Sequence, residues 1–164
     1  MTELVEGRWP LAAPPAPAAT TAGGVPSLSV IVAAYQAAEV IGDAVGSALG
    51  QTVPPLEVIV CDDGSTDDLA GALAPFGDRV RLLRQANGGE AAAKNAAAAA
   101  ASGDYVVVLD ADDVFEPERL EALGACLAAR PDLDLLTTDG WVELGGRRVR
   151  RVYHEGFRLS LIHI

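Results

Sequence analysis

The sequence has few basic residues for its size, and this shortage excludes one broad class of partner. Only 12 Lys and Arg residues stand against 23 Asp and Glu among 164 residues, so the formal net charge is −11. Such a balance argues against nucleic acid as a bulk electrostatic partner. It also means that a ligand carrying phosphate would need a metal ion to offset the charge that the protein itself cannot neutralise.

Long apolar runs and cysteines are also scarce. No uninterrupted apolar run is long enough to span a bilayer, and the N-terminus lacks the basic and apolar regions of a signal peptide. The two cysteines, Cys61 and Cys126, are isolated in apolar surroundings. We expect both to be small buried hydrophobic residues in a reducing compartment, not a disulfide or a metal site. The protein is expected to be cytoplasmic, and any association with the inner face of the cell membrane would come from regions absent from this sequence.

What the sequence does contain is enough apolar material for one domain. Hydrophobic residues make up 50% of the chain, which at this length allows one core of modest size. Residues 1–27 are rich in Pro, Ala, Thr and Gly without a period, and predict a mostly disordered tail. The domain is expected to occupy residues 28–156. Residues 157–164 (FRLSLIHI) have no cap, turn or charged end, and are expected to be the non-native end of a truncated reading frame.

Apolar, β-branched runs alternate with helical patterns along the domain. Strands are predicted at Leu28–Ala34, 56–61, 80–83, 105–109 and 133–138, and helices at 37–49, 67–74, 90–101 and 116–129. The continuous run 105–109 predicts a strand that is buried on both faces of a sheet. This alternation predicts an α/β fold, an open and mostly parallel sheet with helices on both faces and right-handed crossovers.

Local signals also predict a cap and a hairpin. Ser65 or Thr66 is expected to cap the helix 67–74. The pair Gly145-Gly146 lies between two short runs that are typical of strands, Trp141–Leu144 and 147–153. This arrangement predicts an antiparallel hairpin after the parallel sheet.

Polar side chains gather where three of the predicted strands end. Tyr35 and Gln36 follow the first strand, Asp62 and Asp63 the second, and Asp110, Asp112 and Asp113 the fourth. Ligands of open α/β sheets bind beyond the carboxyl ends of the strands. Three carboxylates within four positions repel one another unless a cation or a set of donors holds them, and such hard oxygen ligands suit Mg²⁺ or Mn²⁺. A solvated acidic turn that caps the next helix is the alternative.

Four segments, in this order and at these spacings, resemble the family 2 glycosyltransferases, GT-A fold enzymes that use nucleotide-diphospho-sugars. The segments are SVIVAAYQ at 29–36, CDDGSTDD at 61–68, NGGEAAAKNAA at 87–97 and GDYVVVLDADD at 103–113. The resemblance covers residues 28–153 and implies a Rossmann-like GT-A sheet that is incomplete at its C-terminal end. It also implies inverting, metal-dependent transfer of a sugar from a UDP-type donor to a glycan or lipid, as in cell-envelope polysaccharide biosynthesis.

The resemblance carries roles in nucleotide binding over to five residues. Tyr35 matches the aromatic residue that lies against the nucleobase, and Asp63 matches the carboxylate that accepts a hydrogen bond from a uracil-type N3–H. Asp62 would be its structural neighbour in the turn. Lys94 falls near the diphosphate, and Asn95 matches a recurrent Asn of the same helix. The alternatives are ordinary packing for Tyr35, a helix cap for the acidic pair and a solvated helix face for Lys94.

The resemblance also implies a metal site at the last acidic group. Asp110 and Asp112 match the DxD motif, which in the family holds the ribose and a divalent ion, Mn²⁺ or Mg²⁺. The last Asp of the motif, Asp112, would be the main metal ligand, and Asp113 could share that work. The metal would stabilise the charge that develops on the departing diphosphate, as a Lewis acid.

Two departures from the family pattern limit what the resemblance implies. Alanines stand at 33 and 34 where the family usually has Pro-Thr, so a threonine hydroxyl contact is lost. The family's catalytic base lies on a later segment, and neither Glu143, His154 nor Glu155 matches its motif. No catalytic residue is therefore assigned, and the chain is expected to bind donor without activating an acceptor.

Two other classes of function remain open from the residues alone. A phospho-receiver-like signalling domain would also place an acidic pair and a strand-end aspartate around Mg²⁺, as Asp62-Asp63 and Asp110 could. That fold begins with the acidic-pair strand, whereas here Leu28–Ala34 precedes it, and no later lysine follows Lys94. The other alternative is a non-catalytic fragment that binds a nucleotide.

Overall fold

The computed structural model describes residues 24–138, 140–144 and 147–151. Most of the expected tail, 1–27, and all of the expected non-native end, 157–164, lie outside the described residues. The expected domain, 28–156, is described up to residue 151 apart from residues 139 and 145–146.

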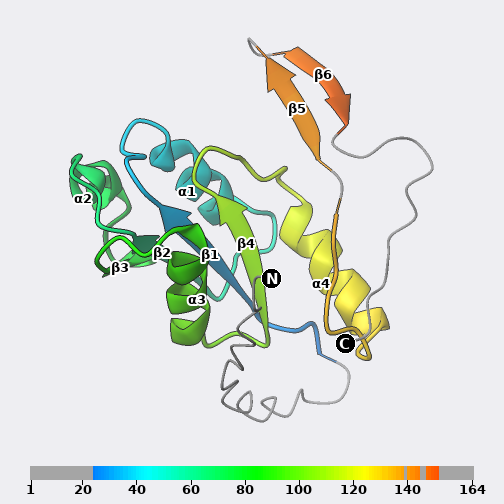
Figure 1. Cartoon of the computed structure of the whole chain (residues 1–164). Coiled ribbons are helices and arrows are strands. Elements are labelled where there is room, and N and C mark those ends of the chain that lie inside the picture. The colour runs from blue at the N-terminus through cyan, green and yellow to red at the C-terminus, as the bar shows by residue number, and fades with distance from the viewer. Residues whose placement is uncertain (1–23, 139, 145–146, 152–164) are drawn as a thin grey trace, which may run out of the picture.

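Four parallel strands form the central sheet (Figure 1), as the alternating pattern predicts. They are β1 (Leu28–Ala34), β2 (Glu57–Asp62), β3 (Val80–Arg84) and β4 (Tyr105–Asp110), in the order β3-β2-β1-β4. The register pairs Ala34 with Asp62 and Ala33 with Asp110. The ends of β1, β2 and β4 are therefore level, and the polar residues that follow them meet at one edge.

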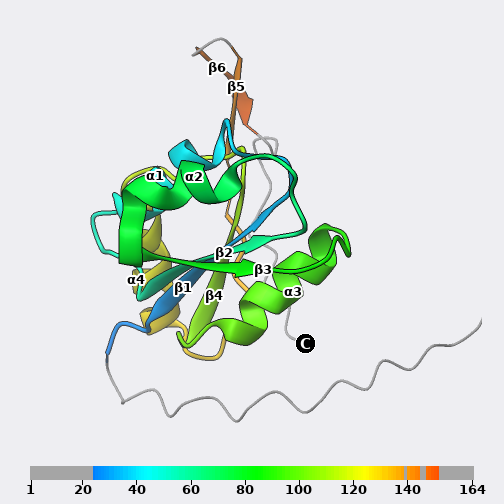
Figure 2. The same ribbon diagram turned by 90° about the vertical axis from the view of Figure 1, so that its left-hand side faces the viewer.

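Helices cover both faces of this sheet (Figure 2), which confirms the predicted layering. One face carries α1 (Ile41–Leu49), α2 (Leu69–Leu73) and α4 (Arg119–Ala129), and the other carries α3 (Glu90–Ala100). A short 3₁₀ helix, η1 (Ala74–Arg79), follows α2.

Two apolar clusters hold the layers together. The larger one joins alternate residues of β1 and β2, such as Val30 and Val60, to the buried face of α1 and α4. The smaller one joins Ile31, Ile59 and Cys61 to Ala93 and Ala97 of α3. Alanine lets α3 lie close to the sheet, because its side chain is short and its helix propensity is high. Cys61 is buried as expected, whereas Cys126 is only half-buried, and both thiols are free.

The prediction that residues 105–109 are buried on both faces is wrong. Val107 and Leu109 are buried, but Val106 and Val108 are 40% and 45% exposed. The reason is that β4 is an edge strand and that α3 packs on β1 and β2 without reaching over β4. An apolar β-branched run does not distinguish a central strand from such an edge.

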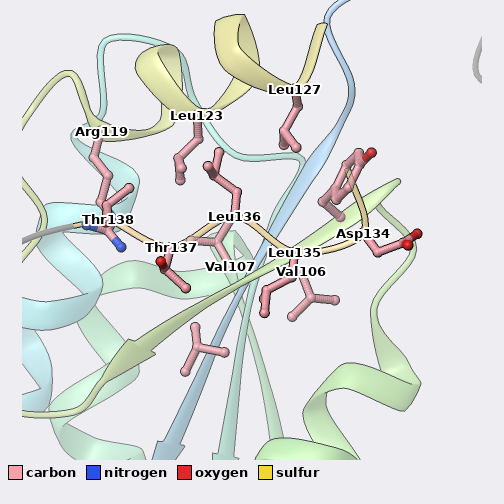
Figure 3. A pocket seen from close by; sticks show the side chains of 12 residues that line it. Val106, Val107, Arg119, Leu123, Leu127, Asp134, Leu135, Leu136, Thr137 and Thr138 are labelled. Atoms are coloured by element: carbon pink, nitrogen blue, oxygen red, sulfur yellow. The ribbon is translucent and has the colours of Figure 1, made fainter. Parts of the chain in front are cut away.

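The prediction of a strand at 133–138 is also wrong. This segment passes beside β4 and α4 without joining the sheet, and a groove of about 300 Å³ lies between them, lined by residues such as Val106, Leu123 and Leu135 (Figure 3). Leu133 is buried in the larger cluster, and the Tyr105 hydroxyl donates to its carbonyl at 3.1 Å. Leu133 thus packs in the core while Leu135 remains 39% exposed, and the segment makes no ladder hydrogen bonds to the sheet.

The helix boundaries move by a few residues, and one cap differs from the prediction. Asp68, and neither Ser65 nor Thr66, caps α2: its Oδ1 accepts from the Gly71 amide at 2.9 Å. The two hydroxyls face Gln36 instead. Helix α1 begins at Ile41 because a turn occupies the preceding residues. The predicted hairpin is confirmed as β5 (Trp141–Leu144) paired antiparallel with β6 (Arg147–Arg151), standing apart from the sheet in Figure 1.

Candidate functional site

The end of β1 is fastened to the turn that follows β2 through one glutamine. Gln36 has a φ of 53°, a left-handed backbone conformation that is uncommon outside glycine. Its side-chain Oε1 accepts from the backbone amides of Thr66 at 2.8 Å and Asp67 at 3.1 Å. Its backbone amide donates to Ser65 Oγ at 3.1 Å. The preceding residue, Tyr35, is left 54% exposed at the sheet edge.

The end of β2 carries two buried aspartates, Asp62 and Asp63, each 3% exposed. Asp62 Oδ1 accepts from the Ser65 amide at 2.7 Å, which closes the turn after the strand. Its Oδ2 lies 3.4 Å from Arg84 Nε at the end of β3. The same guanidinium donates from Nη2 to the Ser65 carbonyl at 2.8 Å. Asp62 is thus a structural residue of the turn.

Asp63 binds the loop that leads into α3. Its Oδ1 accepts from Gln85 Nε2 at 2.7 Å and from the Gly88 amide at 2.9 Å, and its Oδ2 accepts from the Gly89 amide at 2.8 Å. Hydrogen bonds from the Gly88 amide, then the Gln85 side chain and the Gly89 amide, hold the pKa of Asp63 below its ordinary value. Oδ2 has one donor where a carboxylate oxygen can take two, so it keeps capacity for a ligand.

Two glycines make this contact between loops feasible. Gly89 has a φ of +87°, which directs its amide toward Asp63 at the start of α3. Gly64 has a φ of +78°, and a Cβ there would lie 2.9 Å from the Asn87 amide nitrogen. Glycine is therefore needed at 64 both for the backbone conformation and for the close approach of the two loops.

The end of β4 is more open and is held by a lysine of α3. Lys94 Nζ donates to Asp110 Oδ1 at 2.8 Å and also forms an ion pair with Glu90. The hydrogen bonds to Asp110 and then Glu90 raise the pKa of Lys94. Asp112 and Asp113 follow in an exposed turn closed by the Asp113 amide on the Asp110 carbonyl at 3.1 Å. Burial of its carboxyl, and then Asp110 and Asp112, raise the pKa of Asp113.

Two hollows lie side by side at this edge of the sheet. The Asp63 hollow, about 360 Å³, is lined by residues that include Asp63, Asn87, Gly89 and Ala93. The Asp110 hollow, about 410 Å³, is lined by residues that include Gln36, Val40, Asp110 and Asp112. Tyr35 and Glu90 line both hollows. The arrangement can hold an elongated ligand, with an aromatic ring at the junction and carboxylates on either side.

The structure brings together most of the residues predicted for the site, but Asp62, Asn95 and Asp113 stand apart because they line neither hollow. Tyr35, Asp63, Asp110 and Asp112 line the hollows, and Lys94 reaches them through Asp110. Asn95 is exposed and lines neither hollow, because it follows Lys94 by one helical position and turns away by about 100°. Asp113 also lines neither hollow.

The carboxylates at the end of β4 fit a divalent cation as part of its ligand set. Within residues 24–138, 140–144 and 147–151, no group of three or more His, Cys, Asp or Glu side chains forms a complete ligand set. Asp110 and Asp112 nevertheless share one hollow and offer hard oxygen ligands. Mg²⁺ in phosphate sites is usually bound by one or two carboxylates together with substrate phosphates and water, so two are sufficient.

Three further residues contribute to the site without having been predicted for it. For Gln36 the sequence predicts only a position after a strand, and its left-handed φ has no signal in the sequence. At the end of β3, Gln85 donates a hydrogen bond to Asp63, and Arg84 forms an ion pair with Asp62. Their contacts join residues 22 apart in sequence, so no local pattern would indicate them. Gly88 and Gly89 lie in the segment 87–97 that carries the family resemblance, and paired glycines before a helix are a signal for backbone amides that can bind a carboxylate.

The sequence matches the family model described as Glycosyl transferase family 2 over residues 29–154. The chain belongs to this family. The family assignment confirms the resemblance and decides against the receiver-like alternative. Chondroitin synthase of Escherichia coli is 37% identical over 137 residues, which are 79% of this chain and 20% of that protein. The chain spans about a tenth to a fifth of the length of the first curated relatives that it matches.

Solved structures of glycosyltransferases share the fold. TarS 1–349 of S. aureus in complex with UDP-GlcNAc matches with a TM-score of 0.64 and 26% identity, covering 76% of this chain and 37% of that one. The mannosyltransferase PcManGT from Pyrobaculum calidifontis, in complex with GDP-Man and Mn²⁺, matches with a TM-score of 0.58 and 30% identity. It covers 66% of this chain and 34% of that chain. The predicted GT-A type of fold is thereby confirmed. Among the helices described in this family 2 chain, none has the length and apolar character needed to cross a membrane.

Proposed function

We propose that this family 2 chain binds the nucleoside diphosphate of a nucleotide-sugar, with UDP favoured, as the donor half of a metal-dependent, inverting glycosyltransferase. The observation that carries the proposal is the position of Tyr35, which lines both hollows at the carboxyl edge of the sheet. An exposed aromatic ring there can stack on a nucleobase, with a carboxylate on each side to bind the rest of the nucleotide.

The two hollows divide the ligand by chemistry. On the Asp63 side, the buried carboxylate keeps acceptor capacity on Oδ2, which suits an N–H of a pyrimidine base. On the Asp110 side, two carboxylates line a more polar space that suits ribose hydroxyls and a divalent cation. A bound Mn²⁺ or Mg²⁺ would supply Lewis-acid stabilisation of the charge on the leaving diphosphate.

The comparisons support this proposal by what their names state. TarS is solved in complex with UDP and with UDP-GlcNAc, and PcManGT in complex with GDP-Man and Mn²⁺. Nucleotide-sugars are thus ligands of proteins with this fold at 26% to 30% identity. We propose a glycan or lipid as the acceptor, in keeping with relatives named for hyaluronan and chondroitin synthesis.

Calorimetric titration of the 164-residue chain with UDP tests the proposal. We expect UDP to bind in the presence of Mn²⁺ or Mg²⁺, and affinity to fall at least about tenfold when the metal is withheld. The charged diphosphate would then face three carboxylates, Glu90, Asp110 and Asp112, that are offset by a single ammonium. Asp112→Ala should bind UDP equally weakly with and without metal. Asp78→Ala, an exposed aspartate of η1 that lines neither hollow, is the charge-matched control and should keep the metal dependence.

Two outcomes of the UDP titration would contradict the proposal. Equal UDP affinity of the wild-type chain with and without metal would remove the metal role of Asp110 and Asp112. Absence of any UDP binding, with a folded chain and metal present, would overturn the donor-binding proposal itself.

A further inference from the structure

Lys94 lies between two acidic side chains of the Asp110 hollow. Its Nζ is 2.8 Å from Asp110 Oδ1 and is also paired with Glu90. The Lys94 side chain is 26% exposed, whereas those of Glu90 and Asp110 are 70% and 51% exposed. One partly buried ammonium therefore offsets two carboxylates that line the same hollow and would otherwise repel each other.

The Asp110 carboxylate is thus the partner of one cation and a candidate ligand of another, and the two compete for it. In the proposed function it is one of two carboxylates available to a divalent ion. An ammonium at hydrogen-bond distance from Oδ1 both occupies that oxygen and repels a second positive charge. The ammonium thus weakens the binding of a divalent cation to Asp110, and that binding is favoured when Lys94 leaves the carboxylate.

Helix α3 provides a second ion-pair partner for Lys94. Glu90 lies four residues before Lys94 and thus on the same helix face, and its side chain lines both hollows. A lysine side chain is a flexible four-carbon stem with three donors, so Nζ can release one carboxylate while it keeps the other. The ammonium would then remain beside the hollows, where an anionic diphosphate can replace Asp110 as its partner.

We propose that Lys94 is an exchangeable counter-ion of the donor site. It neutralises Asp110 until a divalent cation and a diphosphate bind, and its transfer from the carboxylate to the phosphate makes the binding of each favour the other. This inference rests on the proposed function. By thermodynamic linkage, the factor by which UDP improves metal affinity equals the factor by which the metal improves UDP affinity.

The first test follows Lys94 directly, since it is the only lysine of the sequence. A chain labelled with ¹³Cε-lysine therefore gives one lysine side-chain signal, and Asp110→Asn defines the position of that signal without the ion pair to Asp110, while the pair to Glu90 remains. We expect Mg²⁺ to move the wild-type signal toward the Asp110→Asn position, and UDP added with Mg²⁺ to move it further. Mg²⁺ binding detected by calorimetry with an unmoved Lys94 signal would overturn the inference.

The second test measures the coupling between metal and nucleotide. Without nucleotide, Lys94→Met should bind Mg²⁺ about two- to fivefold more tightly than the wild-type chain, which is the range expected for loss of a competing exposed ion pair. The variant should also show a smaller mutual enhancement of Mg²⁺ and UDP binding. Lys94→Arg keeps the positive charge and the ion pair, and should retain the wild-type coupling, which shows whether the coupling depends on the cation at position 94 and not on loss of side-chain packing.

The two proposals fail in different ways. If the wild-type chain binds UDP with metal but Lys94→Met has the wild-type Mg²⁺ affinity and coupling, the exchange is wrong and the donor site stands. If UDP does not bind the folded wild-type chain at all, the proposed function is wrong and the exchange falls with it.

Discussion

At the end of β2, Asp62 and Asp63 are each 3% exposed, whereas at the end of β4 the Asp110 side chain is 51% exposed. Both strand ends carry carboxylates at the same edge of one sheet. The donors to Asp63 are two backbone amides and a glutamine side chain from a single loop. Within the described residues, the only hydrogen-bond donor that the structure gives to the Asp110 carboxylate is a lysine side chain.

The different donors to Asp63 and Asp110 indicate that the first contributes to folding and the second to ligand binding. Backbone amides at Gly88 and Gly89 cannot leave Asp63 without moving the loop, so that wall of the site is built when the chain folds. A lysine side chain can leave Asp110 by rotamer change alone, so that wall can adapt to a ligand. The β2 end should therefore dominate stability, and the β4 end should dominate ligand binding.

The largest difference between the two strand ends is expected when one carboxylate charge is removed from each, at Asp63 and at Asp110. Asp63→Asn should lower the thermal unfolding midpoint by roughly 5–10 °C, because an amide nitrogen replaces one acceptor oxygen and leaves buried donors unpaired. Asp110→Asn should shift it by no more than about 2 °C, because an exposed ion pair contributes little to stability. Circular dichroism melts of both variants check this, and equal shifts would remove the distinction.

The control for this prediction is its pH dependence. The Gly88 amide, then Gln85 and the Gly89 amide, hold the pKa of Asp63 below its ordinary value. A group with a lowered folded-state pKa contributes stability that is full above its ordinary pKa, about 3.9, and is lost as the pH falls through the folded-state pKa. The gap between wild type and Asp63→Asn should thus be constant near neutral pH and shrink below about pH 4. A gap that widens on acidification would contradict this assignment.

The same contrast explains what could be predicted from the sequence. The four strands and the acidic residues after them carry local signals, since apolar runs and strand ends are read over a few residues. The partners of those acids do not: Gln85 and Gly88 lie 22 and 25 residues from Asp63, and Lys94 lies 16 from Asp110. Such pairs depend on strand order and register, which periodicity does not determine.

The errors have the same origin in tertiary context. Val106 and Val108 belong to a run that is typical of a central strand, yet strand order leaves β4 at the edge of the sheet. Residues 133–138 have the composition of a strand, but Leu133 is buried in the larger apolar cluster, which includes residues of α1 and α4. The role that the resemblance gives to Asn95 stays a prediction, since its exposed position on α3 lines neither hollow but no bound ligand tests it.

A smaller effect is expected where the β1 end is attached to the β2 end. Gln36→Ala should lower the free energy of unfolding by about 1–2 kcal/mol, because the amides of Thr66 and Asp67 lose their acceptor. Gln36→Gly also lacks the side chain, but glycine adopts the φ of 53° without strain, so it should recover about 0.5–1 kcal/mol of that loss. Urea denaturation of both variants measures the difference, and Gln36→Gly less stable than Gln36→Ala would contradict the argument from φ.

The smallest effect on stability is expected at Arg84, the exposed partner of Asp62 at the end of β2. The Arg84 side chain is 65% exposed, with Nε 3.4 Å from the buried Asp62 and Nη2 2.8 Å from the Ser65 carbonyl. Arg84→Met should cost no more than about 1 kcal/mol. Methionine keeps much of the aliphatic stem, Asp62 keeps the Ser65 amide as a donor, and an ion pair with an exposed guanidinium contributes little.

Salt dependence decides whether that cost is electrostatic. The Debye length falls from about 10 Å at 0.1 M salt to about 3 Å at 1 M, so the difference between Arg84→Met and wild type should shrink over this range. Urea denaturation at both salt concentrations measures it, with Arg84→Lys as the control that keeps the charge but not the planar fork. A loss as large as that of Asp63→Asn, or one independent of salt, would show that Arg84 belongs to the rigid wall. The backbone donors alone would then not account for the stability of the β2 end.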